Sequence, residues 1–407
     1  MVRELAYGYI QAALQSPAHE KQFLSKEKSR LDGLSSADQG LYFELTRGVL
    51  RKWKELNFVI QKYITKKTNP QLIELIALSA YQILFLNKVP NFAVFSELKK
   101  ISRKFSEHEF RFCHAILKKI ETDKEKVLTE LSEKKVLQIP RPDFLVRPIT
   151  SVKEKLDILE DYKSEIAPNA LLLKRPISEV DRDFFKKYMV QGECSQWACE
   201  FVSQVILEGN ISSVLELCTG KGGKCLGTLA SLSEKGFLKR LNWLALDHSS
   251  YQLKEFRNYS LKRIEEQFSK LVDLRINTDS EKQAFDLVWV DAPCSGLGVA
   301  QKHPQALLRN YSDQVFKIFQ DEQVNLVEKA IEKSKKYIFY TVCTQTKRET
   351  TEIRDRFNKL KIKGEFFFSS PLELGKFSSL ERFLVKKDSV QMIAASEGFY
   401  GLLLEKN

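Results

Sequence analysis

The sequence contains few of the residues that mark secreted or metal-binding proteins. Its 407 residues include only seven cysteines, an odd number without a dense spacing pattern. This argues against a disulfide scaffold and predicts a reducing, cytoplasmic compartment. The two nearest cysteines, Cys194 and Cys199, lie five positions apart, so there is no CxxC pair and no Cys/His cluster with zinc-ligand spacing. We therefore expect no bound metal.

Long apolar runs are also missing. No segment reaches the ~20 apolar residues that a membrane span requires, and Arg3 and Glu4 are not followed by the apolar core of a signal peptide. Gly (17) and Pro (11) are scarce, whereas 43% of the residues are apolar and 29% are charged. This composition predicts a folded protein of two to three domains with no membrane partner, and it excludes collagen-like and largely disordered chains.

Acidic residues are under-represented in the first third of the chain. The net charge of the whole chain is +12, and residues 1–140 alone carry 24 basic and 16 acidic side chains, a surplus of +8. A local excess of Lys and Arg favours a polyanionic partner, because binding to phosphates releases condensed counterions. A merely solvated basic face is the alternative interpretation.

The same third of the chain shows helical spacing and no strand-like alternation. Apolar residues recur at Val2, Leu5, Ala6 and Tyr9, and the run from Leu72 to Leu86 is apolar nearly all round. We therefore predict an all-α bundle over residues 1–135, with the latter run as its central helix. The basic stretches RKWK (51–54) and KYITKK (62–67) either track a nucleic-acid backbone or are solvated helix faces.

A proline-rich segment, IPRPDFLVRP, follows a charged helix over 121–135 and indicates a domain boundary. Residues 136–190 are assigned to a small linker or substrate-binding subdomain, and residues 191–407 to an α/β domain. In the latter, strand-like runs alternate with helical stretches, which predicts a mostly parallel sheet covered by helices on both faces. The runs are SSVLELC, LNWLALD, KLVDLRIN, FDLVWVD, KYIFYTVC and GFYGLLLE. Ligands of such sheets bind beyond the carboxyl ends of the strands.

The first of these strands ends at Cys218 and leads into the glycine-rich loop TGKGGK, residues 219–224. Glycines let a ligand approach the backbone, and the N-terminus of the following helix offers free N–H groups. The P-loop spacing is absent, and a lone glycine-rich turn also fits NAD, FAD or plain close packing. Asp247 ends the second strand, where a carboxylate can accept the ribose hydroxyls of an adenosine ligand. Together these features favour a nucleoside cofactor.

Two cysteines follow neighbouring strands later in the domain. The fourth strand runs into DAPCSGLG, which contains Asp291 and Cys294, and the fifth ends at Cys343. Because parallel neighbours end at the same edge of a sheet, we expect both thiols and the carboxylate to meet in one crevice. A single buried cysteine is often an inert small apolar side chain, but a pair beside an acid favours a catalytic role.

These motifs resemble the RsmB/Sun family of RNA (cytosine-5) methyltransferases over nearly the whole chain. DAPCSGLG with His303 and Pro304 is similar to the family's fourth motif, YTVCT (340–344) to its YSTCS, and Glu349 to its following acid. ELCTGKGGK, QGECSQ and EGFYGLLLEK resemble further family segments. LTRGVLRKWKELNFVI, AYQILFL and FCHAILKKI resemble the NusB-like domain of the bacterial branch. The resemblance implies a Rossmann-like S-adenosylmethionine-dependent methyltransferase domain preceded by an all-α NusB-like RNA-binding bundle.

The resemblance also implies a cofactor site for S-adenosylmethionine. The loop at the end of the first strand would hold the methionine end of the cofactor, Asp247 the ribose, and Asp279 the adenine amine. The implied cofactor-binding residues are Cys218, Thr219, Gly220, Lys221, Gly222, Gly223, Lys224, Asp247, Asp279 and Asp291.

The same resemblance implies the two-cysteine mechanism. Cys343 would add to carbon-6 of cytosine, so that carbon-5 becomes nucleophilic and takes the methyl group. A protonated Asp291 would hydrogen-bond ring N3, and Cys294 would assist elimination. The implied partner is RNA, specifically small-subunit ribosomal RNA in the bacterial branch, and we expect a monomer.

Several positions depart from the family pattern, and two other functions stay open. The motif-one Asp is Glu216, the Ala-Pro of the glycine-rich loop is Gly220 and Lys221, HPD becomes HPQ at Gln305, and ENE becomes Glu-Thr-Thr at 349–351. The departures leave the thiols and the acid in place. A DNA cytosine methyltransferase would attack through Cys294 instead. A non-catalytic RNA-binding or ribosome-assembly factor would use the basic domain alone.

Overall fold

The computed structural model describes residues 2–133, 145–148, 163–167, 170–173, 188–278, 283–299, 303–308, 312–344, 346–369, 391–394 and 397–406. The chain divides into two compact units. Met1–Arg141 and Ala300–Asn310 form the first, which we call the helical unit, and Pro142–Val299 and Tyr311–Asn407 form the second, which we call the sheet unit.

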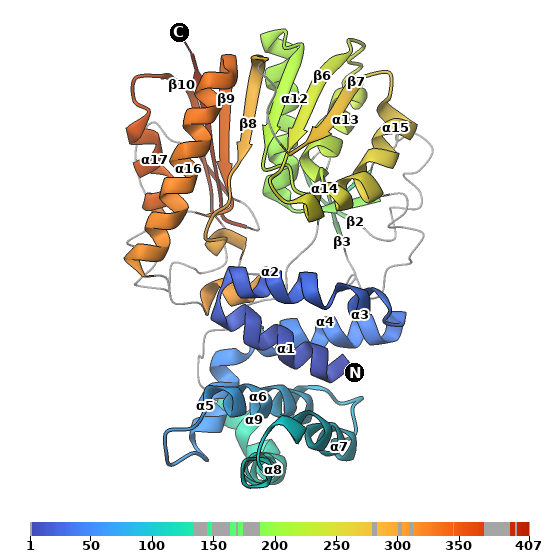
Figure 1. The fold of residues 1–407 in the computed structure, drawn as a ribbon, viewed down its shortest axis with the longest axis vertical. Coiled ribbons are helices and arrows are strands. Elements are labelled where there is room, and N and C mark those ends of the chain that lie inside the picture. The colour runs from blue at the N-terminus through green and yellow to red at the C-terminus, as the bar shows by residue number, and fades with distance from the viewer. Residues whose placement is uncertain are drawn as a thin grey trace. The chain divides into compact units, whose positions relative to one another are not determined.

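The N-terminal part of the helical unit is all-α, which confirms the prediction for this third of the chain (Figure 1). Serine and asparagine side chains begin several of its helices by accepting a backbone N–H, as Ser16, Ser35, Asn69 and Ser106 do. The elements are α1 (Val2–Gln15), α2 (Pro17–Lys26), α3 (Lys28–Asp32), α4 (Ser36–Arg51), α5 (Trp53–Gln61), α6 (Pro70–Phe85), α7 (Asn91–Ile101), η1 (Ser102–Lys104), α8 (Glu107–Thr122) and α9 (Lys124–Glu133).

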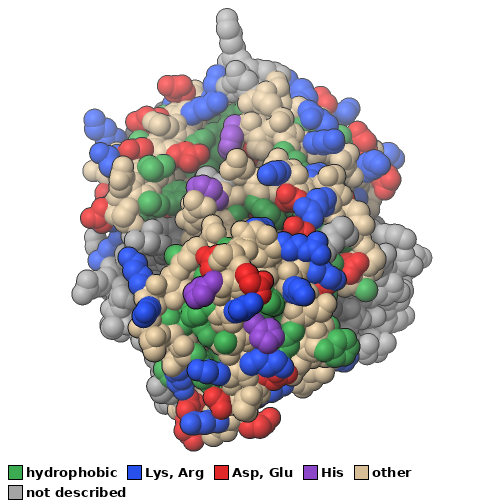
Figure 2. Space-filling model, turned by 60° about the horizontal axis from the view of Figure 1, so that its bottom comes forward, with side chains coloured by type: hydrophobic (Ala, Val, Ile, Leu, Met, Phe, Trp, Pro, Cys, Tyr) green, Lys and Arg blue, Asp and Glu red, His purple; other side chains and the backbone are tan. Residues whose placement is uncertain are grey.

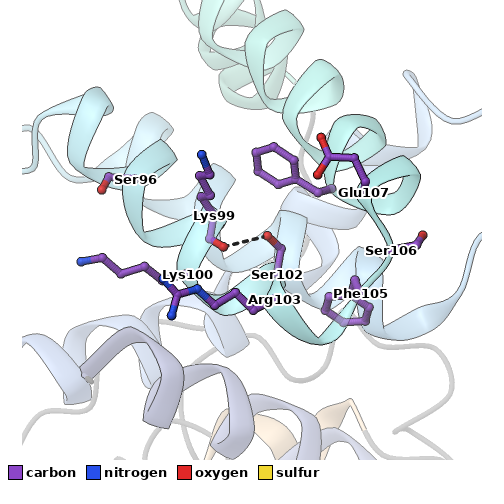
Figure 3. A pocket seen from close by; sticks show the side chains of 9 residues that line it. Ser96, Lys99, Lys100, Ser102, Arg103, Phe105, Ser106 and Glu107 are labelled. Atoms are coloured by element: carbon purple, nitrogen blue, oxygen red, sulfur yellow. Dashed lines mark hydrogen bonds between the residues drawn. The ribbon is translucent and has the colours of Figure 1, made fainter.

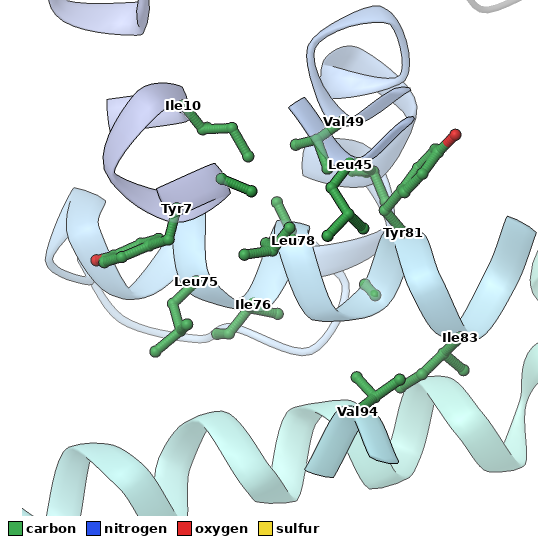
Figure 4. Packing of buried hydrophobic residues seen from close by; sticks show 14 of the residues in the cluster. Tyr7, Ile10, Leu45, Val49, Leu75, Ile76, Leu78, Tyr81, Ile83 and Val94 are labelled. Atoms are coloured by element: carbon green, nitrogen blue, oxygen red, sulfur yellow. The ribbon is translucent and has the colours of Figure 1, made fainter. Parts of the chain in front are cut away.

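Helix α6 is the centre of this unit, as its nearly continuous apolar sequence predicts. Leu75, Ile76 and Leu78 are at most 1% exposed. Figure 4 shows these side chains between α1, which contributes Tyr7 and Ile10, and the helices that carry Leu45, Val49 and Val94. Apolar burial of this extent is the main source of stability for helices that are marginal by themselves.

A short segment from later in the chain belongs to the helical unit. It contains η5 (Pro304–Leu307), and Gln305 is only 3% exposed. The Gln305 amide donates to Glu20 Oε1 at 2.9 Å, and the Tyr9 hydroxyl donates to the same oxygen at 2.6 Å. An Asp at position 305 would place a second carboxylate beside Glu20 and would have no N–H group to donate to it. The departure from HPD to HPQ therefore has a structural reason in this chain.

The region assigned to a middle subdomain is described only at four strands. They are β1 (Leu145–Pro148), β2 (Lys163–Ala167), β3 (Ala170–Leu173) and β4 (Tyr188–Gln191), and they form an antiparallel sheet of order β2-β3-β1-β4. The other residues of 136–190 lie outside the described part of the chain. The boundaries and the substrate-binding role of this subdomain stay predictions.

The sheet unit is built on an eight-stranded sheet of order β11-β10-β12-β9-β8-β5-β6-β7. The six strands predicted from the sequence are present, and β5 to β9 run parallel to one another, which confirms the Rossmann-like expectation. β12 is antiparallel to β9, and the unpredicted strands β10 and β11 extend that edge. The strands are β5 (Ser213–Leu217), β6 (Leu241–Leu246), β7 (Val272–Asn277), β8 (Phe285–Asp291), β9 (Ser334–Val342), β10 (Lys361–Ser369), β11 (Gln391–Ala394) and β12 (Phe399–Glu405).

Helices cover both faces of this sheet (Figure 1). Because successive strand residues point to opposite faces, Val214 packs into a cluster with α12, α13 and α15, whereas Leu215 packs into one with α16 and α17. No helix in the described part of the chain is long and apolar enough to cross a bilayer. The helical elements are α12 (Glu193–Gly209), α13 (Gly223–Glu234), α14 (Ser250–Phe256), η3 (Arg257–Leu261), α15 (Lys262–Phe268), η4 (Leu297–Val299), α16 (Asp313–Lys333), η6 (Lys347–Glu349) and α17 (Thr351–Arg356).

Candidate active site

Two thiols meet at the carboxyl ends of β8 and β9. The strands are parallel with Asp291 opposite Thr341, so the loops that follow them leave the sheet at the same edge. Cys294 lies in the first loop and Cys343 directly after the second strand, and their Sγ atoms are 3.2 Å apart. All seven cysteines of the chain are free thiols. The structure thus brings together the two cysteines singled out from the sequence.

Backbone hydrogen bonds hold this arrangement in place. Ala292 N donates to Thr341 O at 3.0 Å, and Gly298 N donates to Cys343 O at 3.1 Å. A Cβ atom at Gly298 would lie 2.1 Å from Gly398 O, so only glycine fits where the loop meets the segment before β12. The loop that carries Cys294 is therefore fixed both to the end of β9 and to the start of β12.

Two thiols at this edge of the sheet, Cys294 and Cys218, have raised pKa values. The hydrogen bond to Cys343, together with burial, raises the pKa of Cys294 well above its ordinary value, and the nearby carboxylate of Glu349 adds to this. Burial likewise raises the pKa of Cys218 to about 12, with Asp247 as the next cause. Because only a thiolate is a good nucleophile, Cys218 and Cys294 remain protonated and weakly reactive in this state.

A fully buried carboxylate, Glu349, joins the two thiol-bearing loops. Its Oε1 accepts the backbone N–H of Ser295 at 2.8 Å and the amide of Gln323 at 3.2 Å. Its Oε2 accepts the hydroxyl groups of Ser295 at 2.6 Å and Thr346 at 2.8 Å. Ser295 follows Cys294 in sequence, and Thr346 lies just beyond Cys343. Glu349 therefore links both loops through hydrogen bonds alone. None of these contacts is with a cationic side chain.

The sequence indicated Glu349 as the acid that follows the family's motif, but it did not indicate the hydrogen-bond partners of Glu349. Gln323 comes from α16, and its amide also donates to Pro293 O at 2.9 Å, next to Cys294. A glutamine on an otherwise amphipathic helix carries no local signal of this role. The Ser in DAPCSGLG was visible in the motif, but nothing in the sequence indicated its bond to Glu349.

Asp291, at the end of β8, is paired with a lysine from the glycine-rich loop. Lys224 Nζ lies 2.5 Å from Asp291 Oδ2, and the Thr341 hydroxyl donates to Oδ1 at 3.0 Å. Burial alone would lower the pKa of Lys224, but the carboxylate of Asp291 outweighs burial and raises it. The lysine thus stays charged. Asp291 thus accepts one hydrogen bond at each of its two oxygens.

The glycine-rich loop between β5 and α13 has an unusual backbone. Cys218, Gly220 and Gly222 adopt φ values of 60°, 58° and 75°, in the left-handed region that favours glycine. A Cβ at Gly222 would lie 2.3 Å from the Phe256 ring, whereas a Cβ at Gly220 would meet nothing within 4 Å. The loop is therefore packed tightly at Gly222 and faces open space at Gly220, where a ligand can approach the backbone.

Asp247 holds this loop from the end of β6. It is 7% exposed, and its Oδ2 accepts Gly220 N at 2.9 Å while Oδ1 accepts Ser249 N at 2.8 Å. Each carboxylate oxygen retains a lone pair after these bonds. The carboxylate therefore fits two further donors such as the hydroxyl groups of a ribose.

Four further residues were predicted to bind the cofactor, namely Thr219, Gly223, Lys221 and Asp279. Thr219 is buried, and its N–H donates to Leu246 O at 3.0 Å, while Gly223 begins α13. The Lys221 side chain is 55% exposed and lies 3.6 Å from Glu255, away from the Lys224–Asp291 pair. Asp279 lies outside the described residues, so its role stays a prediction.

Beneath the loop lies Glu216, the residue that replaces the family's motif-one Asp. It is fully buried, and its Oε2 accepts the Trp243 indole N–H at 3.1 Å. Burial raises the pKa of Glu216 to about 8.

No group of His, Cys, Asp and Glu side chains suited to a metal ion occurs among the described residues.

Two family models match this chain. Residues 2–122 match the NusB family, and residues 205–371 match the family described as 16S rRNA methyltransferase RsmB/F. The second match spans β5, the glycine-rich loop, Asp291 and both thiols.

Curated relatives are similar to this chain over much of its length. The probable ribosomal RNA small subunit methyltransferase B of Bacillus subtilis is 24% identical, with 88% of each chain covered. The ribosomal RNA small subunit methyltransferase B of Shewanella oneidensis is 23% identical, with 66% of this chain and 69% of the relative covered. In fold, the chain is similar to the crystal structure of PH0851, with a TM-score of 0.66, 18% identity, and 100% and 98% of the two chains covered. The chain therefore contains one region that matches the NusB family and, after it, one that matches the methyltransferase family RsmB/F.

Proposed function

We propose that this protein transfers a methyl group from S-adenosylmethionine to carbon-5 of a cytosine in small-subunit ribosomal RNA, through a covalent adduct with Cys343. The observation that carries the proposal is the pair of thiols with Sγ atoms 3.2 Å apart at two parallel strand ends. Carbon-5 of cytosine is not nucleophilic by itself. A thiolate that adds to carbon-6 makes it so, which is why this chemistry needs a cysteine.

Cys343 is the attacking thiol in this proposal. Its neighbour Cys294 keeps its proton, because the contact with Cys343 and burial both raise the pKa of Cys294. A thiol that donates to its partner supports negative charge on that partner. In the attack, the sulfur of Cys343 forms a bond to carbon-6, and the ring electrons move to carbon-5.

Cys294 acts after methyl transfer. The proton on carbon-5 must then leave, and the bond between carbon-6 and the Cys343 sulfur must break to release a thiolate. Once Cys343 is a thioether, it is neutral, and its part in raising the pKa of Cys294 disappears. Cys294 can then lose its proton to solvent, and its thiolate takes the proton from carbon-5 as the bond between carbon-6 and the Cys343 sulfur breaks.

The residues of the glycine-rich loop fit S-adenosylmethionine. Gly220 faces open space, and the buried Asp247 has lone pairs for two ribose hydroxyl groups. We propose that residues 218–224 hold the methionine end and Asp247 the ribose, with Asp279 near the adenine. When bound, the cofactor supplies an electrophilic methyl group. The protein's part is to orient it and to exclude water from the thiols.

The Lys224–Asp291 pair is proposed to stabilise the activated base. A lysine ammonium has three N–H donors, and Asp291 takes one of them. The others are available to the polar edge of a cytosine when carbon-6 is attacked and negative charge develops. This assigns the donor role to Lys224 positioned by Asp291, in place of the protonated Asp291 expected from the sequence.

The RNA substrate is inferred from the family and the relatives. The matched family and the curated relatives are described as small-subunit ribosomal RNA methyltransferases. Attack on carbon-6 occurs from above the ring, so the target cytosine must be unstacked. A loop or single-stranded position in the RNA is therefore the expected target.

The proposal is tested by trapping the adduct. Cys343→Ala should abolish methyl transfer and form no covalent complex with RNA. Cys294→Ala should accumulate a protein–RNA adduct that survives denaturing electrophoresis, because attack proceeds and elimination stalls. Cys113→Ala, which removes a buried thiol of the helical unit, is the matched control and should retain activity.

Radiolabelled transfer to RNA and to DNA separates the other functions. Adducts in Cys343→Ala but none in Cys294→Ala would show that Cys294 attacks, as in a DNA cytosine methyltransferase. No transfer to any nucleic acid by the wild type would favour a non-catalytic RNA-binding factor. Bisulfite sequencing of ribosomal RNA from a strain without the gene identifies the target cytosine.

A further inference from the structure

A cavity opens in the helical unit where α7, η1 and α8 meet (Figure 3). Its volume is about 350 Å³, and three cationic side chains line it, Lys99, Lys100 and Arg103. Figure 3 shows them at the end of α7 and in η1, with Ser106 and Glu107 at the start of α8 opposite. None of these residues belongs to the basic stretches that the sequence suggested for nucleic-acid binding.

Two of the three cations are not neutralised by the protein. Within the described ranges, no hydrogen bond or ion pair engages the side chain of Lys99 or Arg103. Lys100 pairs with Glu97 at 2.5 Å. The acidic residue of the lining, Glu107, pairs with Arg111 on its own helix at 3.1 Å. The cavity therefore carries an uncompensated positive charge.

The cavity also has an apolar wall. Phe105 and Phe110 line it, and both pack against the hydrophobic core of the helical unit. A wall of low dielectric strengthens the attraction between a bound anion and the two free cations, compared with the same charges on an open surface.

In each basic stretch singled out from the sequence, one lysine has both an acidic and an aromatic partner. In the first, Lys52 pairs with Glu55 at 2.7 Å and lies over the Phe85 ring. In the second, Lys62 pairs with Glu130 and lies over the Phe58 ring. Figure 2 shows Lys and Arg side chains at several places on its face of the molecule, with acidic and His side chains between them. Charge alone therefore does not single out a binding site.

We propose that this cavity binds a backbone phosphate of the RNA substrate. The planar guanidinium of Arg103 matches two phosphate oxygens, and Lys99 contributes a further point charge to the same cavity lining. The hydroxyl of Ser96, also in the lining, is a further donor. The inference rests on the proposed RNA substrate and assigns the helical unit a defined role in binding it.

The test compares two double variants of the full-length protein with the same change in charge. Lys99→Glu/Arg103→Glu alters the cavity. Lys66→Glu/Lys67→Glu makes the same change in charge at two exposed lysines of the KYITKK stretch, outside the cavity lining, and as the matched control it compares the cavity with the basic stretch that the sequence suggested. The readouts are affinity for a short single-stranded RNA across a salt series, affinity for S-adenosylmethionine, and kcat and KM for methyl transfer.

We expect the cavity variant to bind RNA at least ~10-fold more weakly at 0.1 M salt and the control less than ~3-fold more weakly. The log–log salt slope should fall by about 0.7 for each phosphate that the cavity variant no longer neutralises. KM for RNA should rise, while kcat and cofactor affinity stay unchanged in both variants. Inorganic polyphosphate should displace RNA from the wild type, and polyglutamate should not.

Equal decreases in affinity in the two variants, or a larger decrease in the control, would overturn the proposal, because they would show only a general effect of charge. Equal displacement by polyglutamate and polyphosphate would overturn it in favour of an acidic protein partner. If the wild type transfers no methyl group, the binding comparison still stands by itself. Failure of this inference is thus distinguishable from failure of the proposed function.

Discussion

The two units of this protein bury very different side chains. The helical unit has a largely apolar interior, and Glu55 is its buried acid among the described residues. The described part of the sheet unit buries five acids. They are Glu216, Asp247, Glu349, Glu365 and Glu397.

This difference follows from the free-energy cost of burying a carboxylate. Burying a carboxylate costs several kcal/mol unless hydrogen bonds or cations compensate it. In the sheet unit, Asp247 and Glu349 accept backbone and side-chain donors from loops that carry the glycine-rich turn and the thiols. In the helical unit, the charged groups lie mainly on the surface. One unit uses buried charge to fix geometry, and the other leaves its charge available for binding.

The largest effect should come from removing Glu349. Glu349→Ala leaves the Ser295 N–H and the Gln323 and Thr346 donors without their acceptor, so the sheet unit should lose about 3–5 kcal/mol of stability. Glu55→Ala in the helical unit removes an acid that pairs with Lys52 and should cost about 1 kcal/mol. Hydrogen exchange resolved by peptide measures both effects within their own unit. Equal destabilisation by the two variants would show that a buried acid contributes no more to the sheet unit than to the helical unit.

Loss of Asp247 should affect the cofactor more than the fold. Asp247→Ala removes a buried carboxylate and should reduce affinity for S-adenosylmethionine by roughly 2–4 kcal/mol, the range for deleting one partner of a buried charged hydrogen bond. Titration calorimetry measures this directly. Lys66→Glu/Lys67→Glu in the helical unit should bind the cofactor normally. Unchanged affinity in Asp247→Ala would mean that the adenosine site lies elsewhere.

A third effect depends on pH and acts through Glu216. Because the pKa of Glu216 is raised from 4.5 to about 8 by burial, the folded state holds a proton that the unfolded chain releases between these values. The contribution of Glu216 to stability is therefore present below pH 4.5 and lost as the pH rises toward 8. Glu216→Gln, which does not titrate, should gain stability relative to wild type on going from about pH 5 to about pH 8, by up to about 3 kcal/mol at ~1.4 kcal/mol for each pKa unit, and its Tm should rise relative to wild type.

Thermal melts of both proteins across this range test the sign. A constant difference between Glu216→Gln and wild type at all pH values would contradict the raised pKa of Glu216.

Much of the fold was predictable because its signals are local. Helical spacing in residues 1–135 and the runs that became β5 to β9 and β12 reflect side chains that each face a core. Strand β10 was missed. Its register with β12 shifts between Ile362 and Gly364, and such an irregularity breaks the alternation by which a strand is detected.

The site was predictable only in part. Asp291, Cys294 and Cys343 stand at strand ends, so the order of strands along the chain was enough to expect them together. The pairing of Lys224 with Asp291 was not foreseen, because it depends on how α13 begins relative to β8.

By itself, the sequence determined the two fold classes, the two thiols and the glycine-rich turn, because periodicity and strand-end position are properties of short segments. Only the tertiary structure decided which polar groups support them. Glu349 meets Ser295 and Gln323 across separations of 54 and 26 residues. Lys99 and Arg103 became a candidate phosphate site only through the cavity at the start of α8. Hydrogen bonds and cavities of this kind depend on distances between distant segments, which packing sets and local pattern does not encode.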